Sequence, residues 1–238
     1  MNTNFDWPPP FTLRHSTRAK TVSLRISPQR GLQIVVPRGF NPNQAEQVLQ
    51  RHKNWIEKNW RHIQSEATSE PEGPPQQLTL LAIQETWSIQ YRLHPDNCTR
   101  LMIQDNKQLI VQSKATAARK LKIVLTQWLH EQARTHLFPW LNNLSAQHEF
   151  EYSQARIGSA TTRWGSCSAK KKIALNYKLL FLPPALVEYV MLHELCHTTH
   201  LNHSRHFWGL LKIVNPNCHD LRRQLKHANS FIPQWLEN

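Results

Sequence analysis

The chain has 238 residues, of which 39% are hydrophobic and nine are tryptophan, enough for one large or two small cores. Every apolar run, including IALNYKLLFLPPALV, is interrupted by lysine or proline well short of the roughly 20 residues that a membrane span needs, so we expect no membrane partner. Because the N-terminus also lacks a signal-peptide pattern and the four cysteines form no C-x-x-C pair, we expect reduced thiols and a cytoplasmic location.

Positive charge is the second global feature. The formal net charge is +13, and residues 1–62 hold ten lysines or arginines against three acidic residues. Such a field attracts polyanions, so nucleic acid or a nucleotide is one candidate partner. The alternative is a basic surface that contacts only solvent, and no nucleic-acid-binding motif decides between the two.

The N-terminal part is predicted to be rich in β-structure. Residues 22–26 and 32–36 alternate apolar with polar side chains on either side of a turn at Gly31, which predicts strand, turn, strand. A helical pattern covers residues 41–62. Residues 65–77, SEATSEPEGPPQQ, combine acids, prolines and a glycine and predict a flexible, linker-like connection.

Strands and then helices follow along the chain. Two or three strands are expected within residues 86–113, and a long helix from about Thr116 to Leu144. The segments RIGSATTRWGSCS and KKIALNYKLLFL are typical of strands around an exposed lysine turn. We therefore predict an α+β protein with a basic, β-rich N-terminal domain over residues 1–114. Residues 115–238 would form a helical connection and a metal-binding catalytic domain.

The last part of the chain predicts two consecutive helices. Pro184 suits the first position of a helix, and one stripe of that helix carries Leu186, Val190, His193 and His197. Ser204 is placed to cap a second helix, RHFWGLLKIV, whose Phe207 and Trp208 would pack behind the histidines.

The first of these helices carries the motif H-E-x-x-H. Residues four apart are neighbours on a helix, so the imidazoles of His193 and His197 can reach one metal ion. Glu194 lies beside them, where it can hold a water that the metal polarises. The spacing suits zinc, although the same imidazoles would also accept nickel, cobalt or iron.

A third ligand is expected after the helix ends. His200 would lie about 10 Å from His193 along a straight helix, too far for one ion with bonds of about 2.0 Å. The helix must therefore end first, and Asn202 is a residue at which the chain can turn back. His203 is then the best third ligand, with His206 as the second choice.

Four segments together resemble the YgjP-like metal-dependent hydrolases, a zincin-type family distantly related to the SprT-like metallopeptidases. They are RWGSCS at 163–168, LNYKLLFLP at 175–183, HELCH at 193–197 and NHSRHFW at 202–208. A weaker resemblance covers RHSTRAKTVSLRI and HKNWIEKNW near the N-terminus. The resemblance thus extends over nearly the whole chain.

The resemblance implies a zincin-like catalytic domain with one Zn²⁺ per chain. His193, His197 and His203 would hold the ion, and Glu194 would act as the general base. Positions 163, 164, 166 and 176 also match the family, but the resemblance assigns no role to Arg163, Trp164, Ser166 or Asn176. From their charge, Arg163 and His206 are candidates to stabilise a developing oxyanion.

Three functions are compatible with these residues. The first is a zinc metallopeptidase acting on peptide or protein substrates, which could pair with a strand such as KKIALNYKL. The second is a nucleoside triphosphate pyrophosphatase acting on UTP, an activity linked to members of the family. The third is a nucleic-acid-associated protein whose zinc is structural or belongs to a protease. The sequence does not select an oligomeric state.

Overall fold

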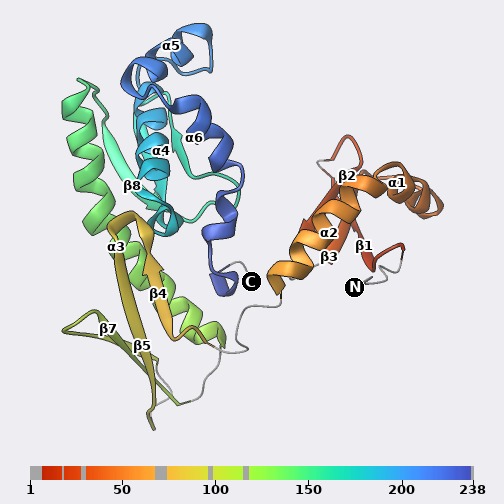
Figure 1. The fold of residues 1–238 in the computed structure, drawn as a ribbon, viewed down its shortest axis with the longest axis horizontal. Coiled ribbons are helices and arrows are strands. Elements are labelled where there is room, and N and C mark those ends of the chain that lie inside the picture. The colour runs from red at the N-terminus through yellow and green to blue at the C-terminus, as the bar shows by residue number, and fades with distance from the viewer. Residues whose placement is uncertain are drawn as a thin grey trace. The chain divides into compact units, whose positions relative to one another are not determined.

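The computed structural model describes residues 7–17, 19–27, 31–67, 74–95, 99–114 and 118–236. Contacts divide the chain into two compact units, Met1–Glu72 and Gly73–Asn238, which we describe one at a time (Figure 1). Both combine helices with sheets, as expected for an α+β protein. In the part of the chain that is described, no helix has both the length and the apolar character needed to span a membrane.

The first unit is a three-stranded sheet covered by helices. The sheet has the order β1-β3-β2, with β1 parallel and β2 antiparallel to β3. Its elements are β1 (Phe11–His15), β2 (Ser23–Ser27), β3 (Gly31–Val36), η1 (Pro42–Gln44), α1 (Ala45–Arg51) and α2 (Lys53–Ala67). The predicted strands of the β2–β3 pair are confirmed, and Gly31 begins β3 with a positive φ of 61°.

Two details of this unit differ from the prediction. The single helix expected over residues 41–62 is broken at His52, whose φ of −108° and ψ of 16° leave the helical region. The helix α2 continues to Ala67, into the predicted connection 65–77, and β4 begins at Gln77. Residues 68–73 of that predicted connection lie outside the described residues.

Every second side chain of β3 is fully buried, which explains why the helices lie on one face of this sheet. Leu32, Ile34 and Val36 alternate along β3 and are fully buried. They pack in one cluster with Leu49 of α1 and Ile56 of α2. The unit therefore has its own small core.

The second unit begins with a four-stranded sheet of order β4-β5-β7-β6. Only the β5–β7 pair is parallel. The elements are β4 (Gln77–Leu80), η2 (Leu81–Ile83), β5 (Glu85–Leu93), β6 (Arg100–Gln104), β7 (Gln108–Ser113) and α3 (Ala118–Gln147). The long predicted helix is present as α3, although Thr116 lies outside the described residues.

This sheet belongs with the C-terminal elements rather than with the first unit. The observed boundary, between Glu72 and Gly73, therefore lies 42 residues before the predicted boundary between residues 114 and 115. The reason is packing. Leu109 and Val111 of β7 share one core cluster with the buried face of α3 and with the helices that follow. The rings of Trp87 on β5 and Trp128 on α3 meet edge to face, with centroids 4.9 Å apart.

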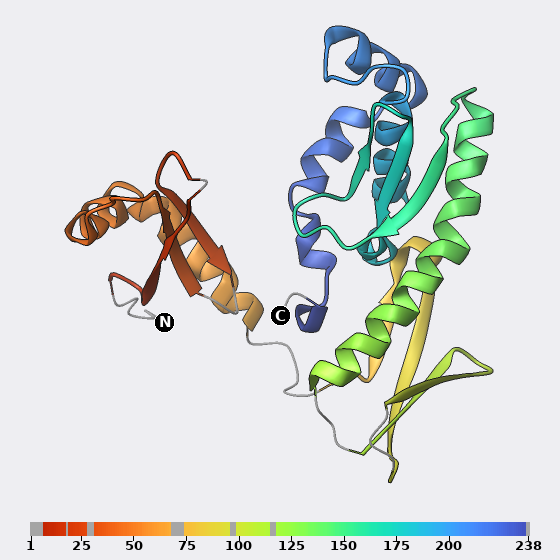
Figure 2. The same cartoon turned by 180° about the vertical axis from the view of Figure 1, so that it is seen from behind.

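A second, three-stranded sheet lies against α3 and the C-terminal helices (Figure 2). Its order is β8-β10-β9, with β8 parallel and β9 antiparallel to β10. The elements are β8 (Gln154–Gly158), β9 (Gly165–Cys167), β10 (Lys172–Asn176), η3 (Tyr177–Phe181), α4 (Pro184–Cys196), α5 (Arg205–Val214), α6 (Cys218–Leu225), η4 (Ala228–Phe231) and η5 (Gln234–Leu236).

The sheet order corrects one prediction about substrate binding. The strand KKIALNYKL contains β10, which is paired on both sides and has no free edge for a substrate. It also ends at Asn176, because residues 177–181 form the 3₁₀ turn η3. The edge strands of this sheet are β8 and β9, and β9 packs against α4.

Candidate metal centre

The helix α4 fixes the first two histidines. Pro184 is its first residue, as predicted, and the helix ends at Cys196 with His197 as its C-cap. Apolar residues are buried on nearly all of its faces rather than on one stripe, which is typical of a central core helix. It contacts β9, β10, α3, α5 and α6, so its C-terminal end is held from several sides.

Three imidazoles converge just beyond this end. The Nε2 atom of His203 lies 3.2 Å from Nε2 of His197 and 3.0 Å from Nε2 of His193. The three potential ligand atoms all lie within 4.8 Å of one another. For zinc–nitrogen bonds of 2.0–2.1 Å, the edges of a tetrahedron are about 3.3 Å, so this donor set fits a tetrahedral metal ion.

A tight reversal brings His203 back to α4. The amides of Thr199 and His200 donate to the carbonyl of Cys196, and Nδ1 of His197 donates to the carbonyl of His200 over 2.9 Å. That bond places the proton on Nδ1 and leaves the Nε2 lone pair for a metal. The helix thus ends six residues before Asn202, the predicted place for the chain to turn back.

The next helix supports the imidazoles from behind. The hydroxyl of Ser204 accepts from the Phe207 amide over 3.4 Å, which confirms the predicted cap of α5. Phe207 is fully buried, and its ring centroid lies 4.5–4.9 Å from those of His193, His197 and His203. The predicted packing role of Trp208 is also seen, since its ring stacks on His203 at 5.8 Å.

The surroundings favour the neutral forms of His193 and His203. Burial lowers the pKa of His193 to about 3, and the neighbouring imidazoles and Arg222 act in the same direction. Burial also lowers the pKa of His203, together with His197 and Arg222. A histidine must be neutral to donate its lone pair to a metal, so the lowered pKa values of His193 and His203 favour the binding of a cation.

Glu194 lies beside the cluster in a buried position, with only 6% of its surface exposed. Burial raises the pKa of its carboxyl group to about 8, against the opposing effects of Arg163 and of a hydrogen bond from the Cys167 amide. Both opposing groups come from β9 or the residues that lead into it. The strand β9 and the helix α4 therefore share the environment of one carboxylate.

Gly165 makes this approach possible. A Cβ atom at this position would lie 2.7 Å from both Cγ and Oε1 of Glu194, closer than real Cβ atoms come to other heavy atoms. This requirement was not predicted from the sequence. The available signal was a glycine within RWGSCS, in a chain with only six glycines.

Asn176, to which no role was assigned, holds the segment before β9. Its side chain is buried, and its Nδ2 group donates to the carbonyls of Ala160 and Arg163 over 2.7 and 2.9 Å. Its Oδ1 atom accepts from the Lys178 amide over 3.1 Å and so begins η3. One asparagine therefore positions the backbone that carries Arg163.

A cavity of about 310 Å³ lies between this segment and the sheet. Arg156, Ala174 and Ser166 are register neighbours across β8, β10 and β9, and all three line it together with Arg163. None of the residues lining the cavity is acidic. It is therefore a cationic hollow next to Gly165.

The structure brings together His193, His197, His203 and Glu194, but it leaves two other histidines outside. The rings of His200 and His206 lie 6.0 Å apart, and neither belongs to the group that could hold a metal. His206, the second choice for the third ligand, is thus not placed with the other two. Of the two candidate cationic donors, Arg163 is the one that acts on Glu194.

Comparison with known proteins agrees with this geometry. The model of the family "YgjP-like, metallopeptidase domain" matches residues 20–228, which cover most of both units. No curated protein and no solved structure matches the chain. Since the family match spans far more than half of the sequence, the protein belongs to the YgjP-like metallopeptidase-domain family of metal-dependent hydrolases.

Proposed function

We propose that the protein is a zincin-like, zinc-dependent peptidase of the cytoplasm, in which His193, His197 and His203 hold the metal and Glu194 is the general base. The observation that carries the proposal is the meeting of three Nε2 atoms beside a buried carboxylate. A structural zinc site would normally close its fourth position with another ligand and would need no such carboxylate.

The residues of the chain divide the chemistry between them. A bound zinc ion would supply a polarised water with a pKa of about 7 and a positive charge that opposes protonation of the carboxylate. Glu194 accepts the proton of the attacking water and then delivers it to the leaving amine. The Cys167 amide holds the Glu194 carboxylate, and Arg163 favours its charged form.

The edge of β9 supports a peptide as the substrate. The Trp164 carbonyl and the Ser168 amide bond to β10, so the backbone groups of Gly165 and Cys167 point to the other side of β9. The Cys167 amide on that side already bonds to Glu194, so a substrate would pair through the Gly165 groups and the Cys167 carbonyl. An extended chain that pairs with this edge would pass next to Glu194, because Glu194 contacts Gly165. We therefore assign strand addition to β9 instead of β10.

Nucleotide hydrolysis is the second candidate. The observation in its favour is the cationic cavity, where Arg156 and Arg163 could bind phosphate groups. Association with nucleic acid through the basic first unit is the third, and salt-dependent binding to random-sequence DNA would test it.

The deciding experiment compares the purified protein with Glu194→Gln and with the control Glu188→Gln, a change on the same helix α4. Metal content is measured first, and each protein is then assayed on an unfolded protein and on UTP. We expect one zinc per chain in all three and loss of proteolysis only in Glu194→Gln. Hydrolysis of UTP alone would select the second candidate, and activity that is indifferent to Glu194 would reject the proposed mechanism.

A further inference from the structure

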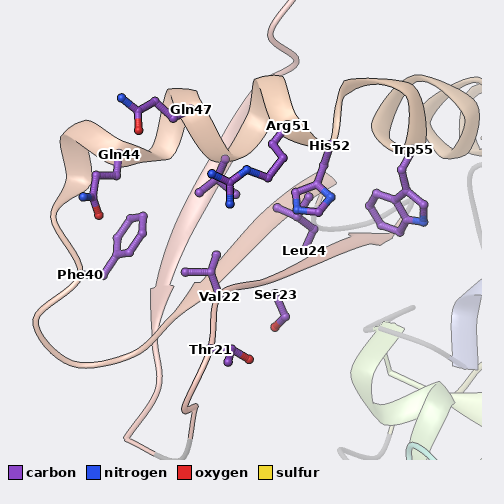
Figure 3. A pocket seen from close by; sticks show the side chains of 11 residues that line it. Thr21, Val22, Ser23, Leu24, Phe40, Gln44, Gln47, Arg51, His52 and Trp55 are labelled. Carbon is purple, nitrogen blue, oxygen red and sulfur yellow. The ribbon is translucent and has the colours of Figure 1, made fainter.

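The first unit contains a groove that the proposed chemistry does not use (Figure 3). It has a volume of about 690 Å³ and lies between the β2 side of the sheet and the helices α1 and α2. That size is within the range of roughly 300–1,000 Å³ that is typical of ligand pockets. The lining residues are Thr21, Val22, Ser23, Leu24, Phe40, Gln44, Gln47, Val48, Arg51, His52 and Trp55.

One wall of the groove is an unpaired strand edge. The sheet order β1-β3-β2 places β2 at the edge, and no strand in the described part of the chain lies on its other side. Leu24 pairs in register with the buried Ile34 of β3 and faces the helices with Val22, two residues earlier. The groove thus lies where a further strand of this sheet would place its inward side chains.

The opposite wall combines two aromatic side chains and Val48 with the polar side chains of Gln44, Gln47, Arg51 and His52. Phe40 and Trp55 lie at opposite ends of the groove in Figure 3, with Arg51 pointing into it between them. Trp55 keeps 43% of its surface exposed. An exposed tryptophan beside an open strand edge is typical of a peptide-binding surface.

The charges around the groove indicate the kind of peptide. No acidic residue lines the groove, Arg51 does, and Lys20 precedes the lining segment that begins at Thr21. Residues 1–62 carry an excess of seven positive charges. A segment that alternates apolar with acidic residues would complement both the apolar floor and the basic rim.

We propose that this groove binds an extended acidic segment of a partner protein, which adds to the sheet beside β2. Its apolar side chains would enter between Leu24 and Trp55, and its carboxylates would lie near Arg51. A nucleic acid would use the positive charge but not the strand edge. The peptide is therefore the better match, and the site is independent of the catalytic proposal.

The test uses the full-length Glu194→Gln protein, so that bound peptide is not cut. The probe is a short fluorescent peptide in which glutamate alternates with valine or phenylalanine, and its affinity is measured by fluorescence polarisation. We expect Trp55→Ala and Arg51→Glu each to weaken binding by about tenfold. Arg38→Glu is an exposed control with the same charge change outside the groove, and it should alter the affinity less than about twofold.

A second probe tests the strand edge directly. The same peptide with alternate backbone amides methylated keeps its charge and side chains but cannot pair with β2, so its binding should be lost. Two results would overturn the proposal. One is equal binding of the methylated peptide, and the other is binding that responds alike to Arg38→Glu and Arg51→Glu and is displaced by a random oligonucleotide. Because the readout is binding, failure here leaves the catalytic proposal standing.

Discussion

Gly165 and Glu194 lie so close together that a single added methyl group would contact the carboxylate, with its Cβ 2.7 Å from Oε1. The helix α4 and the edge strand β9 are thereby coupled at one residue of each. This coupling lets the Cys167 amide, two residues along the strand, reach the same carboxylate.

Gly165→Ala is expected to impair catalysis while sparing the metal. The added methyl group must displace either the Glu194 carboxylate or β9, and misplacement of a catalytic group by about 1 Å can cost on the order of a hundredfold in rate. Peptidase assays and zinc analysis of the same preparation would show this. Gly209→Ala on α5 is the matched control, because a Cβ there meets nothing within 4 Å. Full activity in Gly165→Ala would contradict the assigned contact.

Asn176→Leu is expected to destabilise the second unit. The substitution removes three hydrogen bonds and leaves the carbonyls of Ala160 and Arg163 without their partner, which should cost about 2–4 kcal/mol. Urea unfolding followed by circular dichroism measures the change. Substitution of the exposed Asn229 in the same unit should shift the unfolding midpoint very little. Equal midpoints for the two variants would refute this role of Asn176.

Local geometry explains which parts of the site are predictable from sequence. The rise of a helix excludes His200 as a partner of His193, and a cap at Ser204 requires the chain to reverse before it, so the choice of His203 needs only neighbouring residues. The convergence of the three imidazoles agrees with that reasoning. Their role as metal ligands stays a proposal.

Long-range pairing explains what was not predictable. The apolar pattern of β10 is the same whether one or two strands flank it. That β10 is the central strand, with β8 and β9 as the two edges, depends on how β8 and β9 pair with its two sides. The apolar pattern around Leu109 and Val111 likewise indicates that these side chains are buried, but it does not indicate that α3 covers them. For this reason the sequence placed the boundary between the units too far along the chain. The need for glycine at position 165 depends on a side chain 29 residues away (194 minus 165).

Removal of His203 tests the metal site. His203→Ala deletes the imidazole that lies within 3.2 Å of both partners, so we expect zinc affinity to fall by more than about a hundredfold, measured by competition with a chromophoric chelator. His206→Ala removes a neighbouring imidazole outside the cluster and should retain zinc. A chelator should also lower the melting temperature of the wild-type protein but not that of His203→Ala. If His206→Ala lost the metal instead, the ligand set would have to be revised.

A pH effect is expected far from the metal site, at Glu85. Burial alone would raise the pKa of this carboxyl group, but hydrogen bonds from Lys107 and Trp87, with Lys107 Nζ at 3.0 Å, outweigh it and lower the pKa below the usual 4.5. Because the pKa is lower in the folded state than in the unfolded state, the ionised carboxylate stabilises the folded protein. This stabilisation is complete at pH values above the pKa of the unfolded state. That contribution disappears as the pH falls from about 4.5 through the folded pKa. Glu85→Gln should therefore be less stable than wild type at pH 7, and the difference should shrink on acidification.

Urea midpoints of both proteins between neutral and acidic pH would measure this convergence. Glu131→Gln is a suitable control, because Glu131 contacts Arg134 at the exposed surface of α3, where an ion pair adds little. The stability difference between wild type and Glu131→Gln should stay small across the range. A difference for Glu85→Gln that grew toward acid pH would mean that burial, rather than the bonds from Lys107 and Trp87, dominates at this carboxylate.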